Sequence, residues 1–220
     1  MDAGKANAAR KALEFVREDM VVGLGSGSTA AIFIEMLGVK GLDVACVPTS
    51  FDARALALRA GLRLVGLDEV NRIDVAVDGA DLVDPKHNLI KGMGGALARE
   101  KVVDYLAKKF VCVVDSSKIR PDFRGIVPVE VIPFAARPVA DAIAKEWGAK
   151  VCLRCGSGKC GPLLTDNGNW ILDAEFGKVL KPAELECGLQ LIPGVVANGI
   201  FTRNKPLVVV GEKEGANVLG

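Results

Sequence analysis

Histidine is almost absent from this chain, since His87 is the only one in 220 residues. Histidine is the side chain that most often transfers protons near neutral pH, so a histidine-based mechanism has little support here. We interpret His87 itself as a loop residue. Any proton transfer that this protein performs is therefore expected to depend on carboxylates.

The chain also lacks an excess of either charge and lacks long apolar runs. Its formal net charge is +1, with both signs interspersed, which argues against nucleic-acid binding. No apolar run approaches the length of a membrane span, and the first five residues lack the apolar core of a signal peptide. We expect a soluble, cytoplasmic protein that binds neither nucleic acid nor membrane.

Cysteine is present six times but without a convincing metal or disulfide pattern. Cys46 and Cys112 lie in apolar, strand-like runs and are predicted to be reduced core thiols. Cys152, Cys155 and Cys160, with the distant Cys187, leave a zinc site open as an alternative. The second pair lacks the close spacing usual for zinc, and a disulfide conflicts with a cytosolic protein.

Half of the residues are hydrophobic and 25 are glycine, which suits an α/β enzyme with many tight strand-to-helix turns. The length fits one domain, or one domain with a smaller lobe. In the first half, apolar runs alternate with helical periodicity, which predicts a parallel sheet with right-handed crossovers. The expected helices cover 6–16, 30–37, 52–60 and 95–109, and the expected strands cover 20–24, 44–47, 62–67, 74–77 and 110–114.

The pattern changes near residues 119–121 and predicts a small α+β lobe. The segment Thr165–Asn169 is predicted to form a hairpin turn, because Asn and Gly tolerate positive φ. An apolar strand over 206–210 is expected to return to the main sheet as its last strand. Within the lobe we expect strands over 127–131, 150–153 and 170–174, and helices over 138–147 and 182–191. The expected domains are 1–125 plus 206–220, and the inserted lobe 126–205.

A glycine-rich loop, Gly23 to Ala30, follows the first expected strand. A dinucleotide fingerprint fails, because Ser28 stands where its third glycine would fall and Asp43 begins the next strand instead of ending it. No Gly-Lys-Ser/Thr follows, so a nucleotide-triphosphate loop is excluded. The hydroxyls of Ser28 and Thr29 at a helix start favour a site for one phosphate, with an ordinary helix cap as the alternative.

The most informative segment combines two carboxylates, a lysine, several glycines and a third acid. Asp78 and Asp81 follow a buried strand, and Lys91 and Glu100 flank a glycine loop. In open parallel sheets, the carboxyl ends of strands are where ligands bind. An Asp-Gly pair is also a common turn, but the glycine loop and the lysine favour a site.

Taken together, these segments resemble ribose-5-phosphate isomerase type A over nearly the whole chain. The matching segments are GLGSGSTA at 23–30, PTS at 48–50, DGAD at 78–81, KGMGGAL at 91–97, REK at 99–101, DSSK at 115–118, PVEV at 128–131, TDNGN at 165–169 and IPGVVANGIF at 192–201.

The resemblance implies a Rossmann-like α/β domain with a smaller α+β lobe inserted before the last strand. It implies interconversion of ribose 5-phosphate and ribulose 5-phosphate in the non-oxidative pentose phosphate pathway. It further implies that the reaction needs no cofactor and no metal, and that the chain forms a homodimer or homotetramer whose small-molecule partner is the sugar phosphate.

The resemblance also assigns roles to residues. Glu100 would be the general base, Asp78 and Asp81 would bind the sugar hydroxyls and help to open the ring, and Lys91 would stabilise negative charge. The phosphate would bind at Ser28, Thr29, Lys118 and Lys5. The full set implied to bind substrate is Ser26, Gly27, Ser28, Thr29, Gly79, Ala80, Gly92, Met93, Gly94, Lys118 and Lys5.

Three departures from the family pattern are visible. Leu82 replaces an acid after DGAD, Met93 interrupts the glycine loop, and the Cys152–Cys160 region carries an insert. Two rivals remain. A sugar-phosphate sensor would keep the phosphate loop without needing the base, and Glu100 together with Lys91 argues against it. A glucosamine-6-phosphate deaminase or a coenzyme A transferase would need a different catalytic motif.

Overall fold

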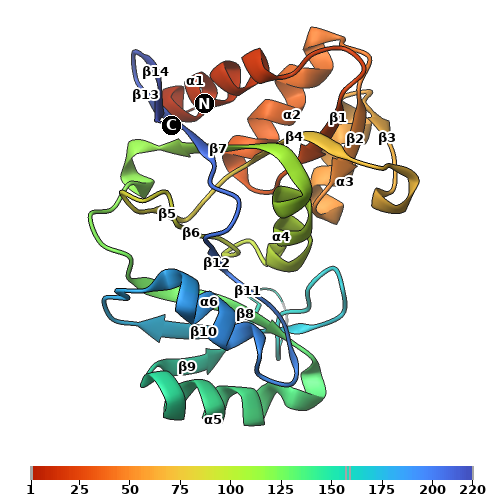
Figure 1. Cartoon of the computed structure of the whole chain (residues 1–220). Helices are drawn as coiled ribbons and strands as arrows, with labels where there is room; N and C mark the ends of the chain where they lie inside the picture. Colours follow the sequence, from red (N-terminus) through yellow and green to blue (C-terminus); the bar gives the residue numbers. More distant parts are fainter. Residues whose placement is uncertain (1, 157, 159, 220) are drawn as a thin grey trace. The chain divides into compact units, whose positions relative to one another are not determined.

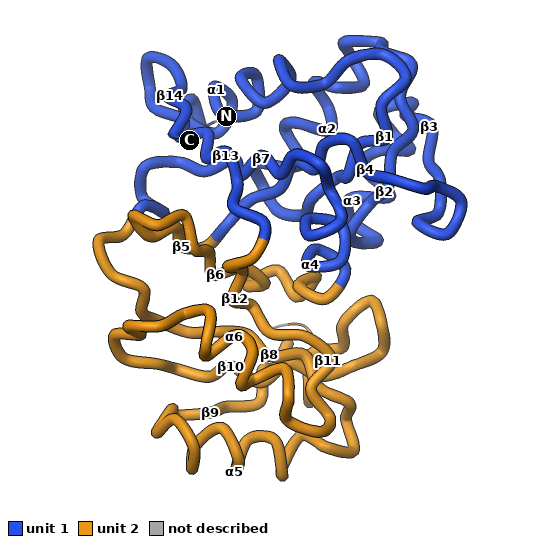
Figure 2. The backbone as a smooth tube through the Cα atoms, viewed as in Figure 1, with its two compact units in different colours: residues 1–80, 99–119, 204–220 blue, residues 81–98, 120–203 orange. Residues whose placement is uncertain are grey.

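The computed structural model describes residues 2–156, 158 and 160–219 (Figure 1). The chain divides into two compact units, residues 1–80, 99–119 and 204–220 in unit 1, and residues 81–98 and 120–203 in unit 2 (Figure 2). Ser157 and Lys159, in the predicted insert, lie outside the described residues. The predicted α/β class with a smaller lobe before the end of the sheet is confirmed, and the expected domain limits stay a prediction.

Unit 1 contains a seven-stranded sheet in the order β14-β13-β7-β4-β1-β2-β3. Its strands are β1 (Val21–Leu24), β2 (Ala45–Pro48), β3 (Arg63–Leu64), β4 (Ile73–Asp78), β7 (Ala107–Asp115), β13 (Leu207–Glu212) and β14 (Gly215–Leu219). All neighbours pair in parallel except β13 and β14. From β1 the chain continues to β2 and β3 on one side and then to β4, β7 and β13 on the other. The strand order therefore reverses between β1 and β4, the place where such sheets bind ligands.

The helices of unit 1 pack on this sheet through apolar side chains. Phe33, Ile34 and Leu37 of α2 are fully buried in a cluster with the apolar residues of β1 and β4. Burial of this kind contributes roughly 1.5–3 kcal/mol for each large side chain. The helices are α1 (Ala3–Ala12), α2 (Ser28–Lys40), α3 (Phe51–Arg59) and α4 (Leu97–Leu106, in unit 1 from residue 99), with short 3-10 turns at Leu13–Phe15, Leu67–Glu69 and Ser116–Lys118.

Unit 2 contains an antiparallel sheet in the order β11-β8-β10-β9. Its strands are β8 (Gly125–Val131), β9 (Lys150–Leu153), β10 (Trp170–Phe176) and β11 (Val195–Asn198). The 3-10 turn η4 (Pro133–Ala135), helix α5 (Ala136–Trp147) and helix α6 (Pro182–Gln190) pack on it, and Val139 and Ile143 of α5 are fully buried in its core. A second, three-stranded sheet joins β5 (Leu82–Val83), β6 (Leu89–Ile90) and β12 (Ile200–Phe201).

The predicted hairpin turn is confirmed. Leu164 pairs with Trp170, Gly168 has a φ of +78°, and the Thr165 N–H donates to the Asn169 carbonyl at 2.9 Å. The buried carboxylate of Glu130 on β8 accepts hydrogen bonds through Oε1 from Thr165, Asn167 and Asn169. Glu130 therefore anchors the turn to strand β8 through these three hydrogen bonds.

Several expected element limits are wrong. The strand over 206–210 is not the last, because β14 returns along β13. The helix expected to reach Lys109 ends at Leu106, since residues 107–109 pair with β4 and lengthen β7. The strand expected over 62–67 shrinks to Arg63–Leu64. The two-residue strands β5 and β6 were missed because they are too short to show a period.

No helix in the described part of the chain is both long and apolar enough to cross a membrane. No disulfide joins the cysteines in the described part of the chain, and Cys46 and Cys112 are buried as predicted. Burial raises the pKa of the Cys46 thiol to about 12, despite the nearby charge of Arg63. Cys46 therefore stays protonated and unreactive in the folded protein.

Candidate active site

Asp78 ends β4, the strand whose apolar residues Val75 to Val77 are buried in the sheet. Its carboxylate is fully buried, and Oδ1 accepts hydrogen bonds from the N–H groups of Ser26 at 3.0 Å and Gly79 at 2.7 Å. A Cβ on Gly25 would lie 2.1 Å from the same oxygen. Glycine is therefore required at this position, because the β1–α2 loop passes directly against the Asp78 carboxylate.

A chain of hydroxyl groups lies at the same edge of the sheet. The Ser26 hydroxyl is 2.9 Å from that of Thr49 and 2.7 Å from that of Ser50. Ser50 also caps α3 by accepting from the Ala53 N–H at 3.0 Å. Sequence reasoning did not place Thr49 and Ser50 at the site. Their position directly after β2, beside β1, was the available signal.

The β1–α2 loop presents the start of α2 without a side-chain cap. Gly27 is the N-cap residue, with a φ of +100° and no side-chain capping bond. Ser28 and Thr29 are the first helical residues, so the alternative of an ordinary Ser/Thr cap is wrong. Lys5 Nζ donates to Ser28 Oγ at 2.9 Å. A cation, a hydroxyl and a helix N-terminus thus converge, an arrangement that suits a phosphate.

Lys118 belongs to the same group of charges in unit 1. It closes the 3-10 turn Ser116–Lys118, which Asp115 caps by accepting from the Ser117 N–H and hydroxyl. Burial alone would raise the pKa of Asp115. The bonds from Ser117 and the positive charges of Lys118 and Lys5 outweigh it and hold that pKa below its usual value. Both lysines predicted to bind phosphate therefore act on one carboxylate.

Glu100 lies in the first turn of α4, as predicted, and only 4% of it is exposed. The positive end of the helix dipole there favours the charged form of a carboxylate. On the preceding residue, the Arg99 guanidinium lies 4.8 Å from the ring centroid of Phe51 on α3. This contact ties the first turn of α4 to α3 within unit 1.

In unit 2, Asp81 and Lys91 border the glycine loop. The Asp81 N–H donates to the Ile90 carbonyl at 2.8 Å, and Asp81 Oδ2 accepts from the Met93 N–H at 3.1 Å. Lys91 is 2% exposed, and its Nζ lies 5.4 Å from the ring centroid of Phe201. Within this unit, the structure thus connects Asp81 to the glycine loop through a hydrogen bond.

The departures from the family pattern have local explanations. Leu82 lies in β5, paired with Ile90, and only 6% of it is exposed, so a buried apolar residue fits there. Met93 is 43% exposed at the tip of the loop. His87 lies in a turn with a φ of +54°, its N–H bonded to the Asp84 carbonyl, which confirms that it is a loop residue.

Each unit therefore gathers its own share of the predicted residues. In unit 1, Lys5 contacts Ser28, and Lys5 and Lys118 both lie near Asp115. The loop from Gly25 to Ser28 packs beside Asp78. Glu100 is buried in the same unit. Unit 2 holds Asp81, Lys91 and the glycine loop together.

Among the described residues, no group of three or more histidine, cysteine, aspartate or glutamate side chains is arranged to hold a metal ion.

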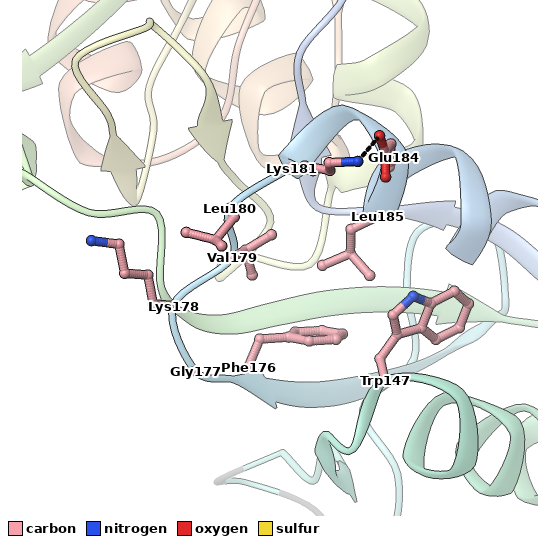
Figure 3. A pocket seen from close by; sticks show the side chains of 9 residues that line it. All are labelled: Trp147, Phe176, Gly177, Lys178, Val179, Leu180, Lys181, Glu184 and Leu185. Carbon is pink, nitrogen blue, oxygen red and sulfur yellow. Dashed lines mark ion pairs between the residues drawn. The ribbon is translucent and has the colours of Figure 1, made fainter.

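A cavity of about 560 Å³ lies elsewhere in unit 2 (Figure 3). Trp147, Phe176 and Leu185 line it, and none of the predicted site residues does. Its lysines are paired, Lys181 with Glu184 at 2.8 Å and Lys178 with Asp122 at 2.6 Å. The walls of the cavity are apolar, and its lysines are already paired with acidic side chains. The cavity therefore does not suit a sugar phosphate.

Comparison with known proteins shows the family to which the chain is similar. Residues 45–215 match the family Ribose 5-phosphate isomerase A (phosphoriboisomerase A). The chain is 50% identical to ribose-5-phosphate isomerase A of Thermococcus kodakarensis, over 96% of this chain and 95% of that one. It is 49% identical to the protein of the same name from Thermosynechococcus vestitus, over 93% and 89%.

Solved structures show the same similarity. A D-ribose-5-phosphate isomerase in complex with phospho-erythronic acid matches with a TM-score of 0.95 and 45% identity, covering 98% of this chain and 96% of that one. Ribose 5-phosphate isomerase A from Methanocaldococcus jannaschii matches with a TM-score of 0.93 and 45% identity, covering 98% and 97%. Because the family model covers residues 45–215 and relatives 50% and 49% identical span nearly the whole chain, this chain belongs to the ribose 5-phosphate isomerase A family.

Proposed function

We propose that the protein is a ribose-5-phosphate isomerase that interconverts D-ribose 5-phosphate and D-ribulose 5-phosphate. The observation that carries the proposal is the presence of Asp78, Asp81, Lys91 and Glu100 in a chain of this family, with three of the four side chains almost fully buried. Acidic and lysine side chains are seldom fully buried unless they are paired, and buried ionisable groups are enriched at functional sites.

The proposed reaction moves one proton between adjacent carbons through an enediolate. Glu100 removes the proton from C2 of the open-chain aldose, and the electron pair of that bond forms the C1–C2 double bond while the aldehyde oxygen becomes negative. The same glutamate returns the proton to C1, and the O2 proton moves to O1. Atoms and electrons balance without a redox partner, and such a base contributes roughly 10²–10⁴-fold.

The remaining residues bind and orient the substrate in this proposal. Asp78 and Asp81 accept hydrogen bonds from sugar hydroxyls and help to open the ring. Lys91 stabilises the negative oxygen, where a unit charge at ~4 Å is worth about 4 kcal/mol at an effective dielectric of 20. Ser28 and Thr29, with Lys118 and Lys5, bind the phosphate. The other residues proposed to contact substrate are Ser26, Gly27, Gly79, Ala80, Gly92, Met93 and Gly94.

The decisive experiment compares Glu100→Gln with a matched change, Glu35→Gln, on an exposed position of α2. Both proteins are treated with a chelator and assayed for conversion of ribose 5-phosphate. We expect Glu100→Gln to lose 10²–10⁴-fold in kcat and still bind phospho-erythronic acid, while Glu35→Gln stays active. Full activity in Glu100→Gln would rule out this base. An inactive wild-type protein that binds the sugar phosphate would indicate a sensor.

The enediolate is tested separately by running the reaction in D₂O. Proton transfer through a carboxylate exchanges with solvent, so deuterium should appear at C1 of the ribulose product in the NMR spectrum. Transfer without any deuterium would give the enediolate no support, because a direct hydride shift and a base shielded from solvent both produce that result.

From the resemblance we also propose the biological setting. The enzyme would act in the cytoplasm, in the non-oxidative pentose phosphate pathway, as a homodimer or homotetramer with the sugar phosphate as its partner. Light scattering during size-exclusion chromatography measures the assembly directly, and a monomeric mass would contradict this part.

A further inference from the structure

One arginine in unit 2 forms hydrogen bonds to the glycine loop that follows Lys91. Arg154 Nη1 donates to the carbonyl oxygens of Gly92 and Met93, both at 3.0 Å. Its Nη2 also lies 3.8 Å from the Met93 sulfur. Arg154 comes directly after β9, between Cys152 and Cys155, in the region whose purpose the sequence did not reveal.

Asp173 on β10 fixes the orientation of this guanidinium. Arg154 Nε donates to Asp173 Oδ2 at 2.8 Å, and Nη2 donates to Oδ1 at 2.5 Å. The Arg154 side chain is only 12% exposed and that of Asp173 is 24% exposed. All five N–H groups of the guanidinium thus have an acceptor, the sulfur being the weakest. A planar guanidinium that is hydrogen-bonded to a carboxylate along one edge and to carbonyl oxygens along another has only one orientation. The two carbonyl groups that it bonds are therefore fixed as well.

Holding those two carbonyls determines where the amide N–H groups point. In a trans peptide the N–H and the C=O point in opposite directions. Because Arg154 takes the carbonyls of Gly92 and Met93, the N–H groups of Met93 and Gly94 point to the other side. The Met93 N–H meets Asp81 Oδ2 there, at 3.1 Å. The peptide between Gly92 and Met93 is therefore held from both sides, by a cation and by a carboxylate.

We propose that Arg154, oriented by Asp173, is a positioning residue for the isomerase reaction. It sets the glycine loop so that the Met93 N–H meets Asp81 and the Gly94 N–H, instead of a carbonyl oxygen, faces the same side. An anionic sugar phosphate and its negative intermediate would be repelled by carbonyl oxygens at that place. This inference rests on the proposed function, and it assigns a role to the end of β9 beside the cysteine-bearing region.

The test uses Arg154→Met, Arg154→Lys and Asp173→Asn, with Arg137→Met as the matched control. Arg137 also pairs with a carboxylate, Asp141 at 2.8 Å, but it is 87% exposed on α5. Small displacements of a positioning element cost on the order of 10²-fold in rate. We expect kcat/KM to fall by about that factor in Arg154→Met and Asp173→Asn, and to stay unchanged in the control.

Three readouts separate positioning from a general loss of folded protein. Lysine should not rescue, because an ammonium cannot bond two carbonyls and both carboxylate oxygens at once. The double variant Arg154→Met/Asp173→Asn should lose no more than either single variant, since both changes remove one unit. Low millimolar guanidinium should restore part of the activity of Arg154→Ala, whereas methylammonium should not. If kcat fell by the same factor as the folded fraction of the protein while KM stayed unchanged, the loss would be one of folded protein. That result would overturn the proposal.

A readout independent of activity keeps the two proposals distinguishable. Amide hydrogen exchange at Met93 and Gly94, measured well below the unfolding temperature, should be faster in Arg154→Met than in Arg137→Met. If the wild-type protein fails to isomerise ribose 5-phosphate, the proposed function fails, and this exchange still decides whether Arg154 holds the loop. Unchanged exchange at both amides, or wild-type kcat/KM in fully folded Arg154→Met, would overturn the inference.

Discussion

Asp74 and Asp78 lie four residues apart on the same strand, β4, and have opposite surroundings. Asp74, near the amino end, accepts from the Val21 N–H at 3.0 Å and pairs with Arg72 at 2.8 Å and Lys108 at 3.2 Å. Asp78, at the carboxyl end, is fully buried and accepts from the N–H groups of the β1–α2 loop and of Gly79 through Oδ1.

This difference separates a structural acid from a candidate functional one. Two largely exposed cations, Arg72 and Lys108, pair with Asp74, so its charge contributes to stability. Asp78 accepts hydrogen bonds from backbone amides that β1 and β4 hold in position, and it is buried at the edge where the strand order reverses. The two ends of one strand therefore allow stability and activity to be tested with the same chemical change.

Asp78→Asn should have the largest effect of the changes to this strand. The amide oxygen can still accept from Ser26 and Gly79, so the fold should survive, while the charge proposed to bind the sugar is lost. We expect kcat/KM to fall about 100-fold, as for a displaced or missing orienting group, with unfolding free energy within about 1 kcal/mol of the wild type. Steady-state kinetics and urea unfolding measure both. A variant with wild-type kinetics would remove Asp78 from the site.

Lys118→Met should have the next largest effect, with Lys108→Met at the amino end as its control. Losing one charge-assisted bond to a phosphate costs about 1.4 kcal/mol, which is tenfold in affinity. We expect KM for ribose 5-phosphate to rise about tenfold in Lys118→Met with little change in kcat. Inorganic phosphate should also inhibit this variant less. Equal effects from both lysines would contradict the assignment of the carboxyl end as the phosphate side.

Asp74→Asn should change stability and leave activity intact. Arg72 and Lys108 are more than half exposed, so solvent screens their attraction. We expect a loss of about 1 kcal/mol in unfolding free energy, measured by urea denaturation, with kcat/KM unchanged. If this variant lost activity as strongly as Asp78→Asn, the two ends of β4 would not differ in the way proposed.

The smallest effect concerns acid stability. Burial alone would raise the pKa of Asp74, but the Val21 N–H, Lys108 and Arg72 outweigh it and hold that pKa below its ordinary value of 3.8. A lowered folded-state pKa stabilises the protein above pH 3.8, and this share is lost as pH falls through the folded-state value. Asp74→Asn should therefore lose less stability than the wild type on acidification below about pH 4. A parallel pH dependence of the two proteins would contradict this explanation.

Local features that the sequence specifies were predictable. Asp78 follows a run of apolar β-type residues, and Glu100 opens a helix after glycines, so both could be assigned to element ends. The turn Thr165–Asn169 follows from residues that accept positive φ. The motifs in their order and spacing also indicated the family, which the comparisons confirmed.

Features that depend on distant parts of the chain were not predictable in the same way. Lys5 reaches Ser28, Ser26 reaches Ser50, and Arg154 reaches Met93 across 61 residues. No local pattern encodes such pairs, because each depends on how strands order in a sheet and where a loop turns back. The extent of β7 was decided in the same way, since pairing with β4 overrides the helical preference of residues 107–109.

The sequence by itself determined which chemical groups are present, at which strand and helix ends they stand, and to which family the chain belongs. Only the tertiary structure decided that Gly25 must lack a side chain, that Asp78 is held by the β1–α2 loop, and that Arg154 orients the glycine loop. The physical reason is that motifs follow from neighbouring residues, whereas the positions of hydrogen-bond partners follow from the packing of whole strands.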